Sequence, residues 1–384
     1  MSVRNTLTGV IRTALTDLLG VEHPIVGFNR SPAVVTEVSR AGGFGVLAAV
    51  SYTAEELDAQ LTWIEEQLDG RPYGVDLLVP EKTADTGADR EDLVAALRAQ
   101  LPAEHLAFVD DLLDGYGIPR VPVDPGRDAI AAGMSRRGAE AQLDAVFAHR
   151  PALVANALGT APPHLVERAH DAGMAVAALV GTRRHAERQL AAGVDVLVAQ
   201  GTEAGGHTGT IATTVLTPEI VDVAGDRPVL AAGGIASGDQ MAAALALGAA
   251  GVWCGSVWLC SVEDVAPESV KRKFLAAGSG DTVRSPARTG KPARQLRSAY
   301  HDAWSAPGAP APLPMPLQPL LTLQAWSSID AAADAGNPGA QELQSFFVGQ
   351  VVGAFTELRG AGEITREMAR DCEHRIAALA GLVR

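Results

Sequence analysis

The sequence predicts an α/β fold, a TIM (β/α)8 barrel with a helical insertion after the third strand and a helical extension at the C-terminus. Two observations carry this prediction. Eight short apolar runs alternate with helical stretches, and runs that are apolar throughout are typical of strands buried on both faces of a parallel sheet. Glycine-rich segments follow the last three runs, at the strand ends where barrels place their functional loops. Eight repeats of the unit favour closure into a barrel, and an open doubly wound sheet is the alternative.

The predicted strands are the apolar runs themselves. They are Pro24–Phe28, Gly45–Ala49, Tyr73–Val79, Ala152–Asn156, Ala175–Val180, Val194–Gln200, Val229–Ala232 and Gly251–Gly255. Helical patterns lie between them, for example at His164–Ala172, Arg183–Ala192 and Gly238–Leu247. A glycine follows each of these three helices, which is a common C-terminal stop.

Two regions interrupt the alternation. The third and fourth strands are separated by more chain than one helix needs, and the extra material, about residues 81–134, predicts two helices with Pro102 between them. An insertion after a strand lies on the functional face of a barrel, so it is either a lid or a surface and dimer contact. Residues 306–321 are rich in proline, which predicts an extended connector without a helix. The expected organisation is a barrel over residues 1–305, this connector, and a helical extension over 322–384.

Composition and charge exclude several classes of function. The net charge is −14, which opposes binding to nucleic acid and to anionic membranes. No long apolar stretch predicts a membrane span or a signal peptide. The three cysteines form no CxxC pair and have no histidine at ligand spacing, so we expect no metal site and a cytoplasmic location.

The segment from Val229 to Gly255 predicts a phosphate site. One strand ends in Gly233-Gly234, a helix follows, and the next strand ends in Gly255-Ser256. Glycines allow backbone N–H groups to approach an anion closely, and barrels often bind phosphate after their last two strands. Plain tight turns are the alternative explanation for these glycines.

The segment AQGTEAGGHTG, residues 199–209, follows the sixth strand and carries His207. Its glycines make a loop that can fold closely around a ring system. A neutral imidazole near pH 7 suits a general base, and the position of His207 on the functional face favours that role over a surface histidine. Glu203 is the weaker acid–base candidate in the same loop.

These segments together resemble the nitronate monooxygenase family, formerly called 2-nitropropane dioxygenases. Further similar segments are HPIVGFN, SRAGGFGVLAA and YGVDLLVP at the first three strands, and TGKPAR at Thr289–Arg294. The resemblance covers roughly residues 20–297. The same fold and histidine-bearing loop occur in FMN-dependent enoyl-thioester reductases.

The resemblance implies a barrel that binds FMN without a covalent bond, with His207 as the base. The residues expected at the cofactor are Gly27, Asn29, Asp76, Gln200, Gly201, Gly206, Gly233, Gly234, Gly255 and Ser256. Two departures stand out: Gly27-Phe28-Asn29 replaces a common Ala-Pro-Met, and Asp76 replaces a common Asn beside the flavin pyrimidine. A charged acid there would disfavour an anionic reduced flavin.

Three functions follow as hypotheses. The first is an FMN oxidoreductase that oxidises nitronates or nitroalkanes with O2. The second is an FMN-dependent NAD(P)H reductase of an enoyl thioester. The third is a barrel that binds a ligand without catalysis. The expected partners are a small-molecule substrate and either O2 or NAD(P)H as the redox partner. A homodimer is compatible with the sequence, and we expect no binding to nucleic acid or to a membrane.

Overall fold

The barrel predicted from the sequence is present in the computed structural model, which describes residues 11–79, 90–123, 136–157 and 159–383. Eight parallel strands close in the order β1-β2-β3-β4-β5-β6-β8-β9. Their bounds are β1 Ile25–Asn29, β2 Phe44–Ala48, β3 Gly74–Leu77, β4 Leu153–Asn156, β5 Ala175–Val180, β6 Val196–Gln200, β8 Val229–Ala232 and β9 Gly251–Cys254. Pairing of β1 with β9 closes the ring, so the sheet is a barrel rather than an open sheet.

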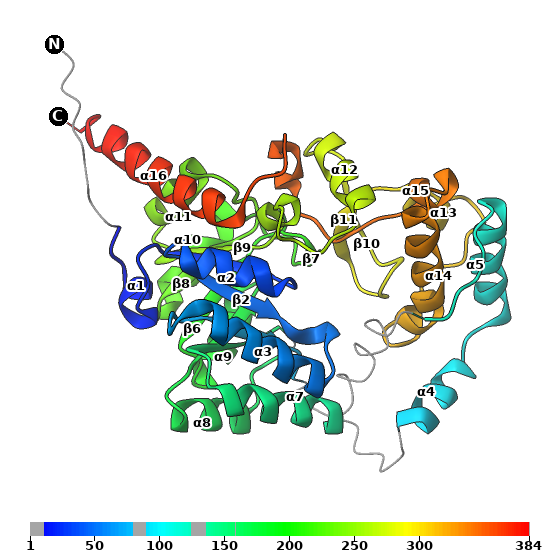
Figure 1. Ribbon diagram of the computed structural model, residues 1–384, viewed down its shortest axis with the longest axis horizontal. Coiled ribbons are helices and arrows are strands. Elements are labelled where there is room, and N and C mark those ends of the chain that lie inside the picture. The colour runs from blue at the N-terminus through cyan, green and yellow to red at the C-terminus, as the bar shows by residue number, and fades with distance from the viewer. Residues whose placement is uncertain (1–10, 80–89, 124–135, 158, 384) are drawn as a thin grey trace.

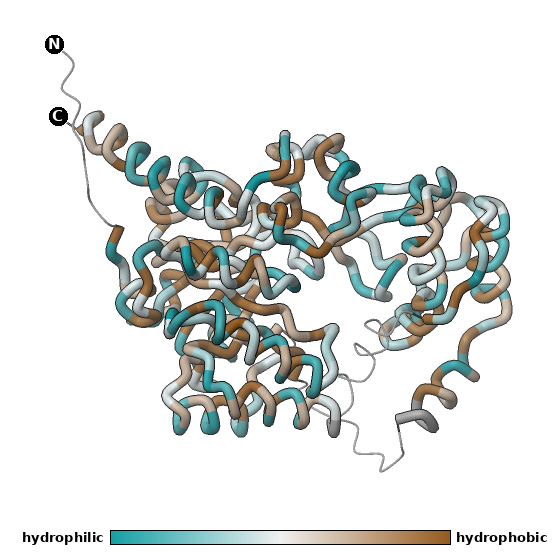
Figure 2. Tube along the Cα trace, viewed as in Figure 1, coloured by the Kyte–Doolittle hydropathy of each residue, from teal (hydrophilic) through white to brown (hydrophobic). Residues whose placement is uncertain are grey.

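The barrel strands are apolar throughout because both of their faces are buried. Val46 on β2 packs inside the barrel, whereas its neighbour Leu47 packs against the surrounding helices. Along each strand the side chains alternate in this way. Figure 2 shows hydrophobic chain concentrated in the strands and more hydrophilic chain on the helices outside them. At Gly45 a side chain would collide with the backbone of Val35, so the glycine lets one helix lie directly on β2.

Helices surround this ring (Figure 1). They are α2 Pro32–Arg40, α3 Ala54–Leu68, α7 Arg136–His149, α8 Pro163–Asp171, α9 Arg183–Ala191, α10 Thr213–Ala224 and α11 Gly238–Ala246, with short η1 Ala49–Ser51 and η2 Ser256–Cys260. The short helix α1, Ala14–Leu19, buries Leu15 and Leu19 among the residues of the barrel interior. The last helix, α16 Ala361–Ala380, packs against α11 and α2, after η3 Gln350–Ala354.

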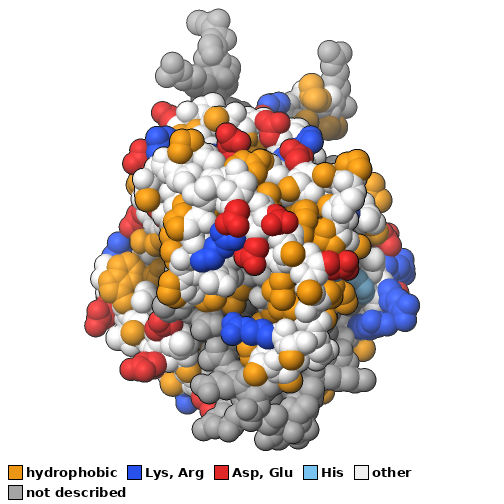
Figure 3. Space-filling model, turned by 90° about the vertical axis from the view of Figure 1, so that its right-hand side faces the viewer, with side chains coloured by type: hydrophobic (Ala, Val, Ile, Leu, Met, Phe, Trp, Pro, Cys, Tyr) orange, Lys and Arg blue, Asp and Glu red, His pale blue; other side chains and the backbone are white. Residues whose placement is uncertain are grey.

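A second, smaller lobe joins the insertion to the C-terminal half of the chain. The insertion supplies α4 Arg90–Arg98 and α5 Ala103–Gly115, and the C-terminal half supplies α13 Ala299–Trp304, α14 Leu317–Asp334 and α15 Pro338–Leu343. Val109 and Leu113 of α5 share one hydrophobic cluster with Trp304 and Trp326. Figure 3 looks onto the molecule from the side of this lobe and shows acidic, basic and hydrophobic side chains interspersed.

The expectation that no helix forms in residues 306–321 is wrong for its last part. Helix α14 begins at Leu317, with Pro319 in its first turn. The first N–H groups of a helix have no partner within the helix, so a proline there costs no hydrogen bond.

A three-stranded sheet outside the barrel is a feature that the sequence did not reveal. It has the order β10-β11-β7, with β7 Gly206–His207, β10 Thr282–Ser285 and β11 Ala293–Leu296. Helix α12, Glu268–Ala276, precedes it in the chain. This sheet fixes the loop that carries His207, because β7 pairs with β11 through His207 and Ala293.

Candidate active site

A cavity of about 300 Å³ opens at the carboxyl ends of the barrel strands. Its walls come from the ends of β1, β2, β5, β6, β8 and β9 and from the segment before α16. It is lined by Phe28, Asn29, Arg30, Ala48, Leu179, Gln200, Ala204, Gly205, Gly206, Ala232, Gly233, Gly234, Ile235, Trp253, Cys254, Gly255, Ser256, Leu259, Phe346, Phe347 and Val351. Seven of the residues expected at a cofactor are therefore brought together here: Asn29, Gln200, Gly206, Gly233, Gly234, Gly255 and Ser256.

The turn after β8 has the properties of an anion cradle. Gly233 and Gly234 have φ values of 99° and 74°, a region that favours glycine. The backbone N–H groups of Gly234 and Ile235 donate to no acceptor within the described part of the chain. Beside the turn, the Ser256 hydroxyl accepts a hydrogen bond from the N–H of Gly349 at 2.8 Å, which leaves its own hydrogen to donate. These donors fit a phosphate group.

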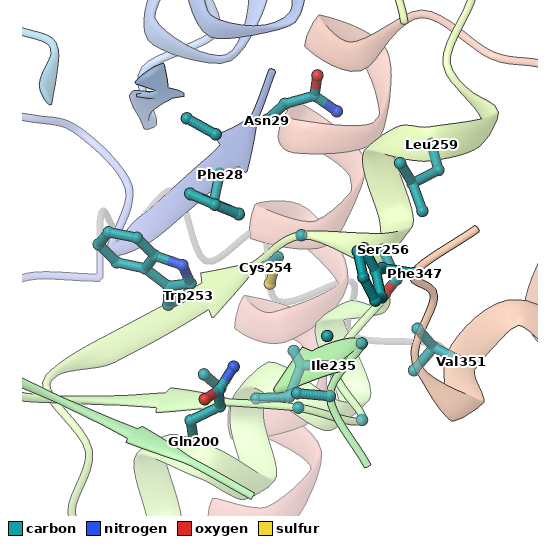
Figure 4. Close-up of a pocket in the computed structure, with 18 of the residues that line it drawn as sticks. Phe28, Asn29, Gln200, Ile235, Trp253, Cys254, Ser256, Leu259, Phe347 and Val351 are labelled. Atoms are coloured by element: carbon teal, nitrogen blue, oxygen red, sulfur yellow. The ribbon is translucent and has the colours of Figure 1, made fainter. Parts of the chain in front are cut away.

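Two further lining residues leave room for a flat ligand. Gly206 has a φ of 77°, and a Cβ added there would meet no atom within 4 Å. Gln200 ends β6, and Figure 4 shows its amide pointing into the space between β6 and β9. Cys254 also lines the cavity, but burial raises the pKa of its thiol to about 12, so it stays protonated. A cysteine thiolate is therefore not the nucleophile of this site.

Three residues expected at the cofactor have packing or hydrogen-bond contacts that hold the fold together. A Cβ at Gly27 would lie 2.8 Å from Val38 on α2, and one at Gly201 would collide with Thr213 on α10, so both glycines serve close packing and neither lines the cavity. Asn29 lines the cavity, but its side chain is occupied. The Asn29 amide donates to Asp264 at 2.8 Å and its oxygen accepts from the N–H of Ser31 at 2.6 Å. Figure 4 shows this amide directed away from Gln200.

Asp76 is an acid buried in the barrel. Its side chain is only 5% exposed, and Oδ1 has no hydrogen-bond partner. Burial raises the pKa of the Asp76 carboxyl well above its usual range, which favours its neutral form. Asp76 pairs in register with Ala48, which lines the cavity, although Asp76 itself does not. A neutral acid does not oppose an anionic flavin, so this shift weakens the electrostatic objection to Asp76.

His207 stands at the rim of the cavity. Its Nδ1 lies 3.4 Å from the carbonyl oxygen of Pro292, which favours a proton on Nδ1 and leaves Nε2 with a free lone pair. Desolvation by the surrounding atoms, and then the charge of Lys291, lowers the pKa of His207, so the imidazole is neutral at pH 7. The side chain remains exposed and does not line the cavity, but its ring centroid is 6.3 Å from that of Phe347, which does.

Two arginines hold both ends of the His207 loop. Arg294 donates to the carbonyl oxygen of Thr202 at 2.8 Å, and Arg284 donates to that of Thr208 at 2.9 Å. The two arginines face each other across the β10–β11 pair. The segment TGKPAR was the available signal for Arg294, whereas nothing in the sequence pointed to Arg284.

Glu203 has a structural role in the same loop. Its carboxylate accepts hydrogen bonds from the backbone N–H and the hydroxyl of Thr213, at 3.0 and 2.8 Å, and so holds the start of α10. Because its carboxylate is occupied by these hydrogen bonds, Glu203 is a weaker acid–base candidate than His207.

Arg30, Phe346 and Phe347 line the cavity and were missed in the sequence. Arg30 directly follows β1, and this position at a strand end could have indicated that it lies on the functional face of the barrel. The two phenylalanines lie far along the chain, and only the tertiary structure brings them to the barrel.

The comparisons with known proteins agree with the cavity. The family model described as nitronate monooxygenase matches residues 12–371. The chain belongs to the nitronate monooxygenase family. A Mycobacterium tuberculosis protein provisionally named monooxygenase Rv1533 is 52% identical over 378 residues, covering 97% of this chain and 100% of the relative.

Two other relatives of this member of the nitronate monooxygenase family are named for different substrates. An octahydroindene-carboxyl-CoA dehydrogenase of Mycobacterium tuberculosis is 34% identical, covering 75% of this chain and 67% of the relative. The crystal structure of a nitroalkane oxidase from Streptomyces ansochromogenes superposes with a TM-score of 0.77 at 29% identity, covering 96% of this chain and 100% of that one. The protein is thus an FMN-dependent oxidoreductase, and the hypothesis of a barrel without catalysis is set aside.

The described residues contain neither a metal-ion cluster nor a membrane-spanning helix. No group of His, Cys, Asp and Glu there is arranged to hold a metal ion. No helix among them is long and apolar enough to span a membrane.

Proposed function

We propose that this enzyme oxidises nitroalkanes or their nitronate anions with O2, and that His207 takes the α-proton of a neutral substrate. The geometry of His207 carries the proposal: its Nδ1 faces the Pro292 carbonyl, so Nε2 is the free basic atom. A general base needs a free lone pair and a pKa that leaves it unprotonated at working pH. The nitroalkane oxidase named among the structural relatives supports this substrate class.

The residues around the cavity fit FMN. Gly233, Gly234 and Ser256 would hold the phosphate through the N–H and hydroxyl donors described above. Gln200 and the open face of Gly206 would lie against the ring system. Bound there, FMN would supply the two-electron redox chemistry between the substrate and O2.

The protein's own groups would perform the proton chemistry. The C–H electron pair moves into the nitro group as the proton goes to Nε2 of His207. Phe346, Phe347 and Trp253 would exclude water from the reacting carbon, because they line the cavity with apolar surface.

A second candidate function is the FMN-dependent reduction of an enoyl thioester by NAD(P)H. The CoA substrate in the name of the 34% identical relative favours it. The largely apolar cavity suits a hydrocarbon acyl group equally well.

Two measurements separate the candidates. Purified, FMN-loaded protein should consume O2 when propionate 3-nitronate or a nitroalkane is added, and no uptake with either would exclude the first candidate. Anaerobic bleaching of the flavin by NADH or NADPH, reversed by an enoyl-CoA, would establish the second. Failure of both nucleotides to bleach the flavin would count against it.

Two expectations about context remain part of the proposal. A reducing, cytoplasmic location is supported by three cysteines that are all free and buried. A homodimer is the expected oligomer, and sedimentation of the purified protein would test it.

A further inference from the structure

Arg30 brings a positive charge to a cavity whose other described lining residues are uncharged. Among the described residues that line the cavity it is the only one that carries a charge. No carboxylate within the described part of the chain lies in ion-pair distance of it, and its buried Nε has no hydrogen-bond partner. A chain of net charge −14 thus leaves a cation without a counterion in this cavity.

An unpaired charge in such a place has a cost. Arg30 is half-buried, and its buried Nε–H is unfavourable without an acceptor unless an anion or another acceptor replaces the water. The Arg30 guanidinium carbon lies 5.4 Å from the centroid of the Phe346 ring, which offsets only part of this cost. An anionic ligand would supply the missing partner.

The surroundings of Arg30 place that ligand on the substrate side of the cavity. Phe346 lies under Arg30, and the next residue, Phe347, lies beside His207. The cation and the proposed base therefore flank one aromatic pair. The donors expected to hold the phosphate of FMN belong to the turns after β8 and β9 instead.

We propose that Arg30 binds the negatively charged head of the substrate, so that the cavity selects a planar anion of two oxygens on an apolar chain. This inference rests on the proposed function and adds to it the residue that determines substrate charge. Arginine presents paired N–H donors that match two oxygens of one planar group. When the α-proton of a nitroalkane moves to His207, the charge left on the nitro oxygens would be stabilised by the same contact.

Binding of a substrate mimic tests the inference without any turnover. Hexanoate has a planar two-oxygen anionic head on an apolar chain, and hexanamide has the same shape without the charge. Isothermal titration of FMN-loaded wild-type protein should show tighter binding of hexanoate. Arg30→Gln should raise the Kd for hexanoate by about 10- to 100-fold, the usual worth of a charge-assisted hydrogen bond, and leave that for hexanamide unchanged. Arg30→Lys should recover part of the hexanoate affinity.

Arg288 supplies a matched control. Its guanidinium also lies over Phe346, at 5.8 Å, and over Phe347, at 4.9 Å, but it does not line the cavity. Its guanidinium donates to the carbonyl oxygen of Ser345 at 2.9 Å, so Arg288→Gln should raise the Kd for hexanoate much less than Arg30→Gln does.

Several results would overturn the inference. They are equal binding of hexanoate and hexanamide by the wild type, an unchanged hexanoate Kd in Arg30→Gln, or an equal loss in Arg288→Gln. Loss of FMN from Arg30→Gln would assign the arginine to the cofactor and also overturn it. If nitronates prove not to be substrates while hexanoate binding still depends on Arg30, the proposed function fails and the inference stands.

Discussion

Gly234 offers the sharpest test of the phosphate cradle. Gly234→Asp would place a carboxylate in the turn whose N–H groups point at the expected phosphate, whereas Gly234→Asn would place a neutral group of the same shape there. Both variants must adopt the φ of 74°, which Asn and Asp tolerate better than most residues, so the backbone cost is similar in the two. The difference between them isolates charge.

The size of that difference follows from electrostatics. At a separation of about 5 Å and an effective dielectric of about 20, two unit charges repel by roughly 3 kcal/mol. A phosphate with close to two charges raises the penalty to about 5 kcal/mol, which corresponds to roughly a thousandfold or more in Kd. The carboxylate of Glu203 belongs to the same neighbourhood, since its Cγ lies 3.7 Å from the position of a Cβ on Gly234. It would raise the pKa of the new acid and reduce the penalty somewhat.

Titration of apoprotein with FMN, followed by quenching of flavin fluorescence, measures the effect. Gly234→Asn should bind FMN within about tenfold of wild type, and Gly234→Asp should bind at least about a hundredfold more weakly than Gly234→Asn. Circular dichroism of the apoproteins controls for folding. Equal FMN affinity in the two variants would show that the phosphate lies elsewhere.

Three further predictions concern His207 and Asp76. His207→Asn should retain FMN and lose about two to four orders of magnitude in the turnover of neutral nitroethane, but much less in that of ethyl nitronate, which has already lost its proton; equal losses in both assays would contradict the role of base. Because the pKa of His207 is lowered, kcat/KM for nitroethane should fall only as the pH drops below 6.5, the ordinary pKa of histidine. The kcat/KM for the nitronate should show no such fall. A fall for nitroethane that begins at or above pH 6.5 would contradict the lowered pKa. Asp76 has a raised pKa in the folded protein and ionises at its ordinary pKa when unfolded, so its contribution to stability is lost as pH rises above that ordinary value. The free energy of unfolding of the Asp76→Asn apoprotein, relative to that of wild type, should therefore increase between pH 5 and pH 8. A difference between the two proteins that does not change with pH would contradict the raised pKa of Asp76.

The sequence predicted the barrel because its strands carry a strong local signal. Runs such as AVAALV at Ala175–Val180 are apolar on both faces, and the helix that follows begins and ends at recognisable residues. The same reasoning could not find β10 and β11. Their sequences, TVRS and ARQL, are short and mixed in polarity, and they become strands only because they pair with each other and with β7.

The candidate site was partly predictable for a similar reason. Gly233 and Gly234 follow a strand directly, so their place in the chain gives their place in the barrel. Asn29 is also at a strand end, but its hydrogen bond to Asp264 joins residues far apart in the sequence and decides where its side chain points. Phe347 reaches the cavity from beyond the barrel, and no local pattern could reveal that contact.

The smaller lobe has a consequence for the order of events during synthesis. Helix α5 leaves the ribosome early, yet the surface that covers Val109 and Leu113 comes from α14 and α13, which are made after the whole barrel. The nascent insertion therefore has to keep an apolar face uncovered while most of the chain is still being translated, a situation that invites chaperone binding and aggregation. A chain that stops before Leu317 would complete its ring of strands and still expose this face.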